Sequence, residues 1–272
     1  MVDTAEKGKG AGETPPEVSA HDTIDQIVRT AKRHSIPIRT SFLQQPSVTG
    51  AVTPGPLSSL VRAGDRRGLV LYLMLMTKAS SGDFEVALPA TVWARALGIW
   101  DPSSRSATSK VSKTWLRLEQ HGLIERQRRD RRAEVRPLRE DGSGLPYTHP
   151  GADKVRHLKV PHSLWTDGPE GGADRWYEIL SLPELSLLMI SLSMRPDFRL
   201  PFENAPGWYG ISADTAMRGL NGLVDRQILR RRKQFKKAPL TSLGFTNENR
   251  YTLLQPFART LPFVAAASGA TP

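Results

Sequence analysis

Two stretches of the chain share one pattern of apolar and polar positions. Residues 106–132 read SATSKVSKTWLRLEQHGLIERQRRDRR, and residues 211–237 read ISADTAMRGLNGLVDRQILRRRKQFKK. A shift of 105 residues aligns their apolar positions. In each stretch, apolar residues at i, i+4 and i+7 predict the buried face of a helix, and an apolar pair after a short break predicts the start of a strand. A segment rich in Arg and Lys follows directly in both copies.

The pattern around each copy predicts the same order of elements: helix, short strand, helix, helix, strand, turn, strand. In the first half we expect helices over 65–78, 89–98 and 103–121, a short strand over 84–88, and two strands within 124–138. In the second half we expect helices over 181–194, 203–209 and 212–227, and strands over 198–201, 229–235 and 250–254. The first helix of each half is apolar nearly all round, which predicts that it is buried.

The remaining segments have the composition of tails and connections. Residues 1–20 are rich in Gly, Lys, Glu and Pro, and residues 35–56 contain four prolines. We therefore predict a disordered or linker arm over 1–56 with a short amphipathic helix at 22–34, a first domain over 57–141, a linker over 142–159, a second domain over 160–257, and a C-terminal tail over 258–272.

Charge is the strongest compositional signal. The formal net charge is +11, and the isoelectric point is about 10.2. Residues 1–54 contain six Lys or Arg and six Asp or Glu, so the whole excess lies in residues 55–272, where both copies of the repeat occur. A basic excess of this kind indicates a polyanionic partner.

Other classes of function have little support in the sequence. The chain contains no cysteine, which excludes disulfides, thiolate metal sites and thiol nucleophiles. The six histidines have no metal-binding spacing, and no phosphate-binding loop or nucleophile elbow occurs. We predict no enzymatic activity, no catalytic or metal-binding residues and no cofactor. The longest apolar runs, 69–76 and 185–190, are too short to span a bilayer, and no secretory signal is evident, so we expect a cytoplasmic protein without a membrane partner.

The order of elements resembles the winged helix-turn-helix superfamily, found in transcription regulators and in plasmid- or phage-type replication initiators. The resemblance covers residues 57–141 and 160–257, and SATSKVSKTWLRLEQHGLIER and YGISADTAMRGLNGLVDRQILRRR carry it. It implies a mainly α fold with small β-wings (α+β), with two winged helix-turn-helix domains in tandem. The second copy departs from the first at Gly219 and Gly222, which we place on the surface of the helix, where they lower its helix propensity.

The resemblance implies that the third helix of the first domain enters a major groove and that both wings contact phosphates or a minor groove, so that specificity lies mainly in the first domain and the second adds affinity. The corresponding side chains lie opposite the apolar stripe or in the basic segment. In the first domain they are Ser109, Lys110, Lys113, Arg117, Arg126, Arg128, Arg129, Arg131 and Arg132. In the second domain they are Thr215, Arg218, Arg230, Arg231, Arg232, Lys233, Lys236 and Lys237. The alternative for each set is an ordinary solvated surface, and Trp115 is expected to pack in the core rather than stack on bases.

We therefore predict sequence-specific binding of double-stranded DNA, in association with the nucleoid. One role is replication initiation or maintenance of a plasmid or other mobile element, and another is transcription regulation. The replication or transcription machinery would then be a further partner. A third alternative is a non-enzymatic winged-helix subunit of a chromosome-organising complex, whose wings contact protein. The sequence leaves the oligomeric state and the choice among these roles open.

Overall fold

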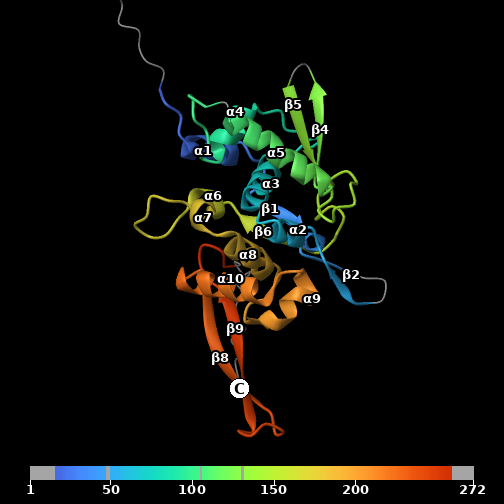
Figure 1. The fold of residues 1–272 in the computed structure, drawn as a ribbon, viewed down its shortest axis with the longest axis vertical. Helices are drawn as coiled ribbons and strands as arrows, with labels where there is room; N and C mark the ends of the chain where they lie inside the picture. Colours follow the sequence, from blue (N-terminus) through green and yellow to red (C-terminus); the bar gives the residue numbers. More distant parts are fainter. Residues whose placement is uncertain (1–15, 47–49, 105, 130–131, 259–272) are drawn as a thin grey trace, which may run out of the picture.

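The fold is a mixture of helices and small antiparallel sheets, as the α+β prediction requires (Figure 1). The computed structural model describes residues 16–46, 50–104, 106–129 and 132–258, without the side chains of residues 128, 129 and 132. The predicted tail beyond residue 258 and residues 1–15 of the predicted arm therefore lie outside the described residues, as does Arg131.

The first half of the molecule runs from α1 to β5. Its elements are α1 (Ala20–Arg29), β1 (Ser35–Arg39), η1 (Thr40–Phe42), β2 (Gln44–Pro46), β3 (Val52–Pro54), α2 (Leu57–Arg62), α3 (Arg66–Lys78), α4 (Ala90–Ala96), α5 (Ser106–Gln120), β4 (Ile124–Arg129) and β5 (Arg132–Pro137). The predicted helices at 65–78, 89–98 and 103–121 are thus confirmed, and the helix predicted at 22–34 is present but ends at Arg29. The predicted strand at 84–88 contributes a single bridge, from Val86 to Val135.

The second half runs from β6 to β9. Its elements are β6 (His157–Pro161), α6 (Ser163–Thr166), α7 (Trp176–Ile179), α8 (Leu182–Ser193), β7 (Phe198–Arg199), η2 (Phe202–Asn204), α9 (Ala205–Tyr209), α10 (Ala213–Asp225), β8 (Leu229–Lys237) and β9 (Phe245–Leu253). Strand β9 lies between β7 and β8, and Val86 pairs with β5 at the matching place in the first half. The last strand begins at Phe245 rather than near 250, because its ladder with β8 continues to the pair Lys237–Phe245.

The buried helices α3 and α8 lie at the centre of the two halves. Asp65 caps α3 by accepting a hydrogen bond from the Gly68 N–H, and Ser181 and Glu184 form a capping box at α8. Ten of the thirteen residues of α3 and eleven of the twelve of α8 are buried, so neither helix has a solvated face. Helix α5 packs on α3, and α10 packs on α8. The third helix of each half is therefore positioned by a helix that is buried over most of its length.

The predictions of a linker arm up to residue 56 and of a linker over 142–159 are wrong. Strand β1 pairs antiparallel with β6, with Ile36 opposite Val160 and Ile38 opposite Leu158. All four side chains are buried, α3 packs against β1, and α8 packs against β6. Both strands belong to the core because pairing of β1 with β6 buries the alternating apolar residues of the two strands together. Pro37 fits this ribbon because a two-stranded sheet leaves some N–H positions without a ladder partner.

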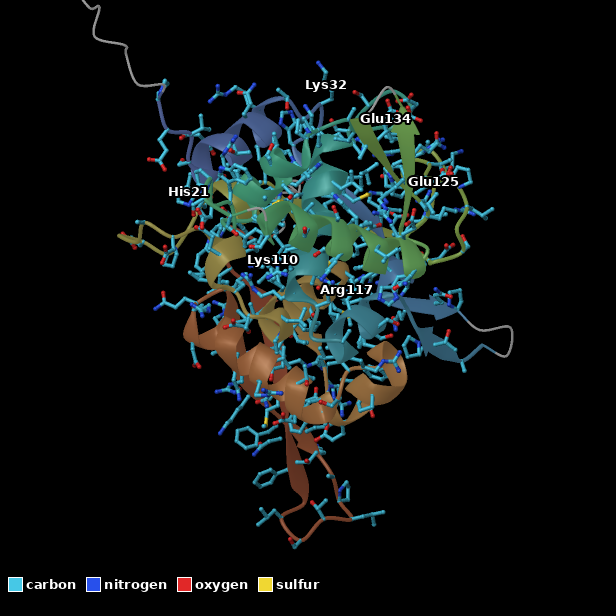
Figure 2. All side chains as sticks on the ribbon, turned by 45° about the horizontal axis from the view of Figure 1, so that its top comes forward. His21, Lys32, Lys110, Arg117, Glu125 and Glu134 are labelled. Carbon is cyan, nitrogen blue, oxygen red and sulfur yellow. The ribbon has the colours of Figure 1, made fainter. Side chains whose placement is uncertain are left out.

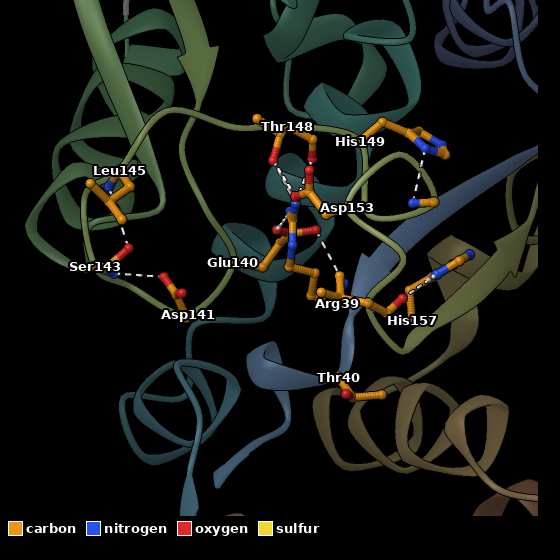
Figure 3. A network of polar contacts seen from close by, with 12 residues as sticks. Arg39, Thr40, Glu140, Asp141, Ser143, Leu145, Thr148, His149, Asp153 and His157 are labelled. Carbon is orange, nitrogen blue, oxygen red and sulfur yellow. Dashed lines mark hydrogen bonds and ion pairs between the residues drawn. The ribbon is translucent and has the colours of Figure 1, made fainter.

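A buried polar network fixes the end of β1 (Figure 3). The Arg39 guanidinium donates to Glu140 Oε2 at 2.5 Å, to the Thr148 carbonyl oxygen at 2.8 Å, and to the carboxylate of Asp153. The backbone N–H of Arg39 donates to Glu140 Oε1 at 3.1 Å. Burial raises the pKa of the Glu140 carboxyl, and the adjacent Arg39 charge limits that rise. The network ties β1 to the segment that joins the two halves.

Further contacts join the halves into one continuous hydrophobic core that extends from Ile24 to Phe257. The Arg66 guanidinium donates to the Leu180 carbonyl oxygen at 2.8 Å, and Trp165 Nε1–H donates to Thr77 Oγ1 at 3.0 Å. Arg175 pairs with Asp25 of α1 at 2.8 Å. The two halves therefore have a fixed relative position, although the element order repeats.

Gly219 and Gly222 do not have the surface role that the sequence indicates. Gly219 is buried against α8, and a Cβ there would lie 2.7 Å from the Pro183 carbonyl oxygen and 3.0 Å from the Leu187 side chain. A Cβ at Gly222 would clash with Glu184 Oε1. The glycines allow the close approach of α10 to α8, which outweighs their low helix propensity.

We expect Gly219→Ala to lower the free energy of unfolding by about 1–3 kcal/mol, because the backbone of Pro183 must move to admit the methyl group. The control is Gly207→Ala in α9, where an added Cβ meets no atom within 4 Å. That change should be neutral or stabilising by up to about 1 kcal/mol. Urea unfolding followed by circular dichroism measures both, and equal stability of the two variants would contradict this packing of α10.

Candidate nucleic-acid interface

Helix α5 has one buried face and one exposed polar face. Val111, Trp115 and Leu118 are buried, and the Trp115 ring packs edge-on against Trp93 with centroids 5.4 Å apart. The expectation that Trp115 is a core residue is thus confirmed. Ser109, Lys110 and Lys113 are exposed on the opposite face, and no acidic residue occurs between residues 106 and 118. Figure 2 labels Lys110 and Arg117 along this helix, near the middle of the molecule.

Arg117 has a structural partner that the sequence did not indicate. Its Nε donates to Asp65 Oδ2 at 2.7 Å, and its Nη2 donates to Asp65 Oδ1 at 2.8 Å. Burial acts to raise the pKa of the Asp65 carboxyl, but the Arg117 guanidinium and the Gly68 N–H outweigh it, so this pKa lies below its ordinary value. Arg117 therefore fixes α5 to the N-terminus of α3, and it is not free to contact a base edge.

The second half contains an equivalent pair. Arg226, at the end of α10, donates from Nε to Glu184 Oε1 at 2.8 Å, and Glu184 also caps α8. In each half, an acid at the N-terminal end of the buried helix thus binds an arginine in the third helix or at its C-terminal end. Sequence reasoning missed Arg226, although an acid at the start of each largely apolar helix was the available signal.

The hairpin β4–β5 is less cationic than residues 126–132 alone indicate. Arg126 pairs with Glu119 at 2.6 Å, and Arg136 pairs with Glu85 at 3.2 Å. Glu125 and Glu134 also lie on this hairpin (Figure 2). Arg126 is therefore neutralised within the fold. Backbone pairing of Arg129 with Arg132 places the turn at the outer end, whereas the side chains of Arg128, Arg129, Arg131 and Arg132 lie outside the described residues and stay predictions.

Helix α10 offers a weaker surface than α5. Arg218 is exposed, but it pairs with Asp214 one turn earlier at 2.9 Å. Thr215 is half-buried, and its Oγ1 accepts a hydrogen bond from Ser212 at the helix N-terminus. Asp225 is also exposed on this helix. The acids of α10 therefore reduce its attraction for a polyanion relative to α5.

The hairpin β8–β9, which we call the cationic hairpin, carries the most uncompensated charge. It projects from the body at the lower end of Figure 1. Arg231 donates to Asn221 Oδ1 of α10 at 2.9 Å, and Arg232 pairs with Asp197 at 3.1 Å. The other four predicted cations are exposed and form no ion pair with any described residue: Arg230, Lys233, Lys236 and Lys237.

The strand register divides the cationic hairpin into two faces. Gln234 lies opposite Glu248, whose carboxylate pairs with Arg199 and Arg250. Residues 231, 233, 235 and 237 point to the other face, together with 245, 247, 249 and 251. That second face contains no acidic residue. One face of the hairpin thus contains a single acid, Glu248, among its cations, and the other face contains cations and no acid.

Metal and membrane chemistry find no support in the described part of the chain. It contains no group of three or more His, Asp or Glu side chains arranged to hold a metal ion. Among the same residues, no helix has the length and apolarity needed to cross a bilayer. The predictions of no enzymatic activity and no cofactor stay predictions.

Comparison with protein-family models, curated proteins and solved structures gave no match to this chain.

We expect Asp65→Asn to lower the free energy of unfolding by about 1–3 kcal/mol near pH 7, because the neutral amide still caps α3 but cannot bind the Arg117 charge. The depressed pKa of Asp65 sets the sign of the pH dependence. The stabilisation is present above the unfolded-state pKa of about 3.9 and is lost as pH falls through the lower folded-state value. The difference between the wild type and Asp65→Asn should thus shrink below about pH 4.

Urea unfolding of the two proteins between pH 3 and 7 measures this difference. Asp214→Asn is the matched control, because its pair with Arg218 is solvent-exposed and contributes little. A cost for Asp65→Asn that equals that of Asp214→Asn, or that is unchanged at pH 3, would contradict the role assigned to the pair.

Proposed function

We propose that this protein binds double-stranded DNA sequence-specifically through two winged helix-turn-helix units in tandem. The repeated element order supports the proposal: each half has a buried helix, a short second helix, a third helix with an exposed face, and a β-hairpin. In both halves a residue or strand before the second helix pairs with the hairpin, namely Val86 in one and β7 in the other. This is the arrangement that the winged-helix resemblance implies.

The observation that carries the proposal is the uncompensated charge on the cationic hairpin. Four exposed Lys and Arg side chains stand there without an ion-pair partner among the described residues, and the second face has no acid. Like charges at this density repel each other, so a polyanion that neutralises them gains binding energy. Duplex DNA supplies regularly spaced phosphates, and their neutralisation releases condensed counterions.

We assign base reading mainly to α5. A helix fits the major groove, and the exposed face of α5 has hydroxyl and ammonium donors without a competing carboxylate. Ser109, Lys110 and Lys113 are the residues for this role. Helix α10, with its paired Arg218 and exposed Asp214, would contribute orientation and phosphate contacts instead.

The shape of the molecule favours an extended duplex site. The hairpins β4–β5 and β8–β9 project near opposite ends of the long axis (Figure 1). The pairing of β1 with β6 holds the two halves in one orientation. Two binding units at a fixed separation select a composite site of fixed spacing, and binding of one unit raises the effective concentration of the other.

For the biological role we propose origin binding in the replication of a plasmid or other mobile element. Selection of bound duplexes from a random pool, followed by location of the recovered sequence in the source genome, tests both the DNA binding and the biological role. Recovery of one composite sequence beside a replication gene is the expected result. Recovery at promoters would replace this role with transcription regulation, and failure to retain any duplex at low salt would refute DNA binding.

We expect Lys233 and Lys237 of the cationic hairpin to contact phosphates. Lys233→Ala with Lys237→Ala should make the slope of log affinity against log salt shallower by about two units, since each contact contributes about −0.9. The charge-matched control is Arg29→Ala with Lys32→Ala at exposed positions at and after the end of α1, distant from this hairpin (Figure 1). Fluorescence anisotropy over a range of salt measures the slopes. Equal slopes for the two double variants would remove the cationic hairpin from the interface.

Variants of α5 distinguish side chains that read bases from the arginine that anchors the helix. Lys110→Ala and Lys113→Ala should each reduce discrimination between the selected site and random duplex by about 1–3 kcal/mol for a true base contact. Arg117→Ala should instead lower protein stability, because it leaves Asp65 without its partner. Competition binding with both duplexes measures discrimination. A uniform loss of affinity for all sequences in the two lysine variants would limit these side chains to phosphate.

A further inference from the structure

The outer end of the cationic hairpin exposes large apolar side chains. Their exposed fractions are 68% for Phe235, 103% for Leu240, 72% for Leu243 and 41% for Phe245. We call these four residues the apolar tip. A buried role in the fold explains none of them, because the tip projects away from the body (Figure 1). Exposed apolar groups grouped in this way indicate a surface that becomes covered in a complex.

The two phenylalanines lie on the acid-free face of the hairpin. Phe235 follows Lys233 and precedes Lys237 on that face, and Lys237 lies directly opposite Phe245. The two rings meet edge-on, with centroids 5.4 Å apart. The apolar tip is thus flanked by ammonium groups, and the only acid of the two strands, Glu248, lies on the other face.

The base of the hairpin is held firmly, so the tip has a defined support. Tyr251 is buried and packs on Phe198 with ring centroids 5.7 Å apart. Arg231 bonds to Asn221 of α10 at 2.9 Å. Because β8 pairs with β9 along its whole length, the ladder transmits this anchorage to Phe235.

We propose that the apolar tip is a wedge that enters the minor groove of bound duplex DNA, inserts between neighbouring base pairs and kinks the duplex. The inference rests on the proposed DNA binding. A two-stranded ribbon can lie along a groove, with Lys233 and Lys237 beside the phosphates of the groove walls. Apolar side chains that enter from the minor groove unstack a base step and bend the duplex away from the protein.

Charge complementarity selects DNA as the occupant of this surface. The lysines that flank the two rings require an anionic partner, and the aromatic faces require an apolar surface between the anionic groups. Stacked base pairs bordered by two phosphate strands meet both requirements within the width of one hairpin. An anionic lipid surface meets the same requirements over a larger area, and the experiment includes it as an outcome.

The bend of bound DNA is the readout. The probe is the duplex recovered by selection from the random pool, with a donor and an acceptor fluorophore at its two ends. Full-length wild-type protein at saturation should bring the ends together by a kink of about 20–90°. Phe235→Ala with Phe245→Ala should abolish most of this approach and weaken binding by roughly 5- to 100-fold per ring, with an unchanged salt slope.

Two further variants separate insertion from hairpin stability. Phe235→Leu with Phe245→Leu retains apolar side chains and should retain the bend. Leu240→Ser with Leu243→Ser alters the turn and leaves both strands intact, so it should reduce the bend without loss of the β8–β9 ladder. A 2-aminopurine base at the kinked step should brighten with the wild type and stay dim with Phe235→Ala.

The outcomes distinguish the inference from the function on which it rests. If no duplex is retained at low salt, DNA binding and the wedge both fail. If duplex is retained and the wild type leaves it straight, only the wedge is overturned. The same holds if the Phe→Ala double variant and the Leu→Ser double variant both bend the duplex as the wild type does. Phe-dependent binding to vesicles of phosphatidylserine and phosphatidylcholine, with a bend independent of both phenylalanines, would assign the tip to a lipid surface and also overturn it.

Discussion

The arrangement of the molecule depends on one antiparallel ribbon, the pairing of β1 with β6. Each strand precedes the buried helix of its own half, and each packs on that helix. Because the two strands share hydrogen bonds and bury Ile36, Ile38, Leu158 and Val160 together, neither half can rotate relative to the other without exposing that apolar surface. The positions of α5, α10 and both hairpins follow from this ribbon, since α5 packs on α3, α10 packs on α8, and the hairpins contact α5 and α10.

Charge in this protein serves both structure and the proposed binding, and ion-pair geometry separates the two uses. Arginines that reach an acid at the start of a buried helix, Arg117 and Arg226, hold the third helices in place. Arg39 does the same for β1 through Glu140. Desolvation opposes the formation of such pairs, but breaking one leaves a buried charge without its partner. Their cations are therefore not available to a ligand. The lysines of the cationic hairpin form no ion pair with any residue that the structure describes, so they remain for the proposed partner.

The sequence predicted the elements whose signals are local. Apolar periodicity identified α3, α5, α8 and α10, and the basic segments identified both hairpins. It did not predict β1–β6, because a five-residue strand with Pro37 resembles a linker until its distant partner is known. It also misplaced Gly219, Arg117 and Arg126, since helix–helix distance and ion-pair partners depend on tertiary contacts. The residue types of the candidate interface were predictable from the sequence. Which of their charges already have an ion-pair partner within the fold was not.

The fixed geometry also bears on how the proposed complex would gain specificity. Two binding units on a flexible linker recognise half-sites at many spacings, whereas units joined through a shared core accept one spacing, at a smaller loss of conformational entropy on binding. The acid-free face of α5 suits base reading, and the cationic hairpin suits backbone contact and deformation of the duplex. Deformation is itself sequence-dependent, because flexible base steps kink at lower cost than stiff ones. The second half, whose helix α10 is less suited to base reading, would thus still contribute to sequence choice through the shape of the DNA rather than through its base edges.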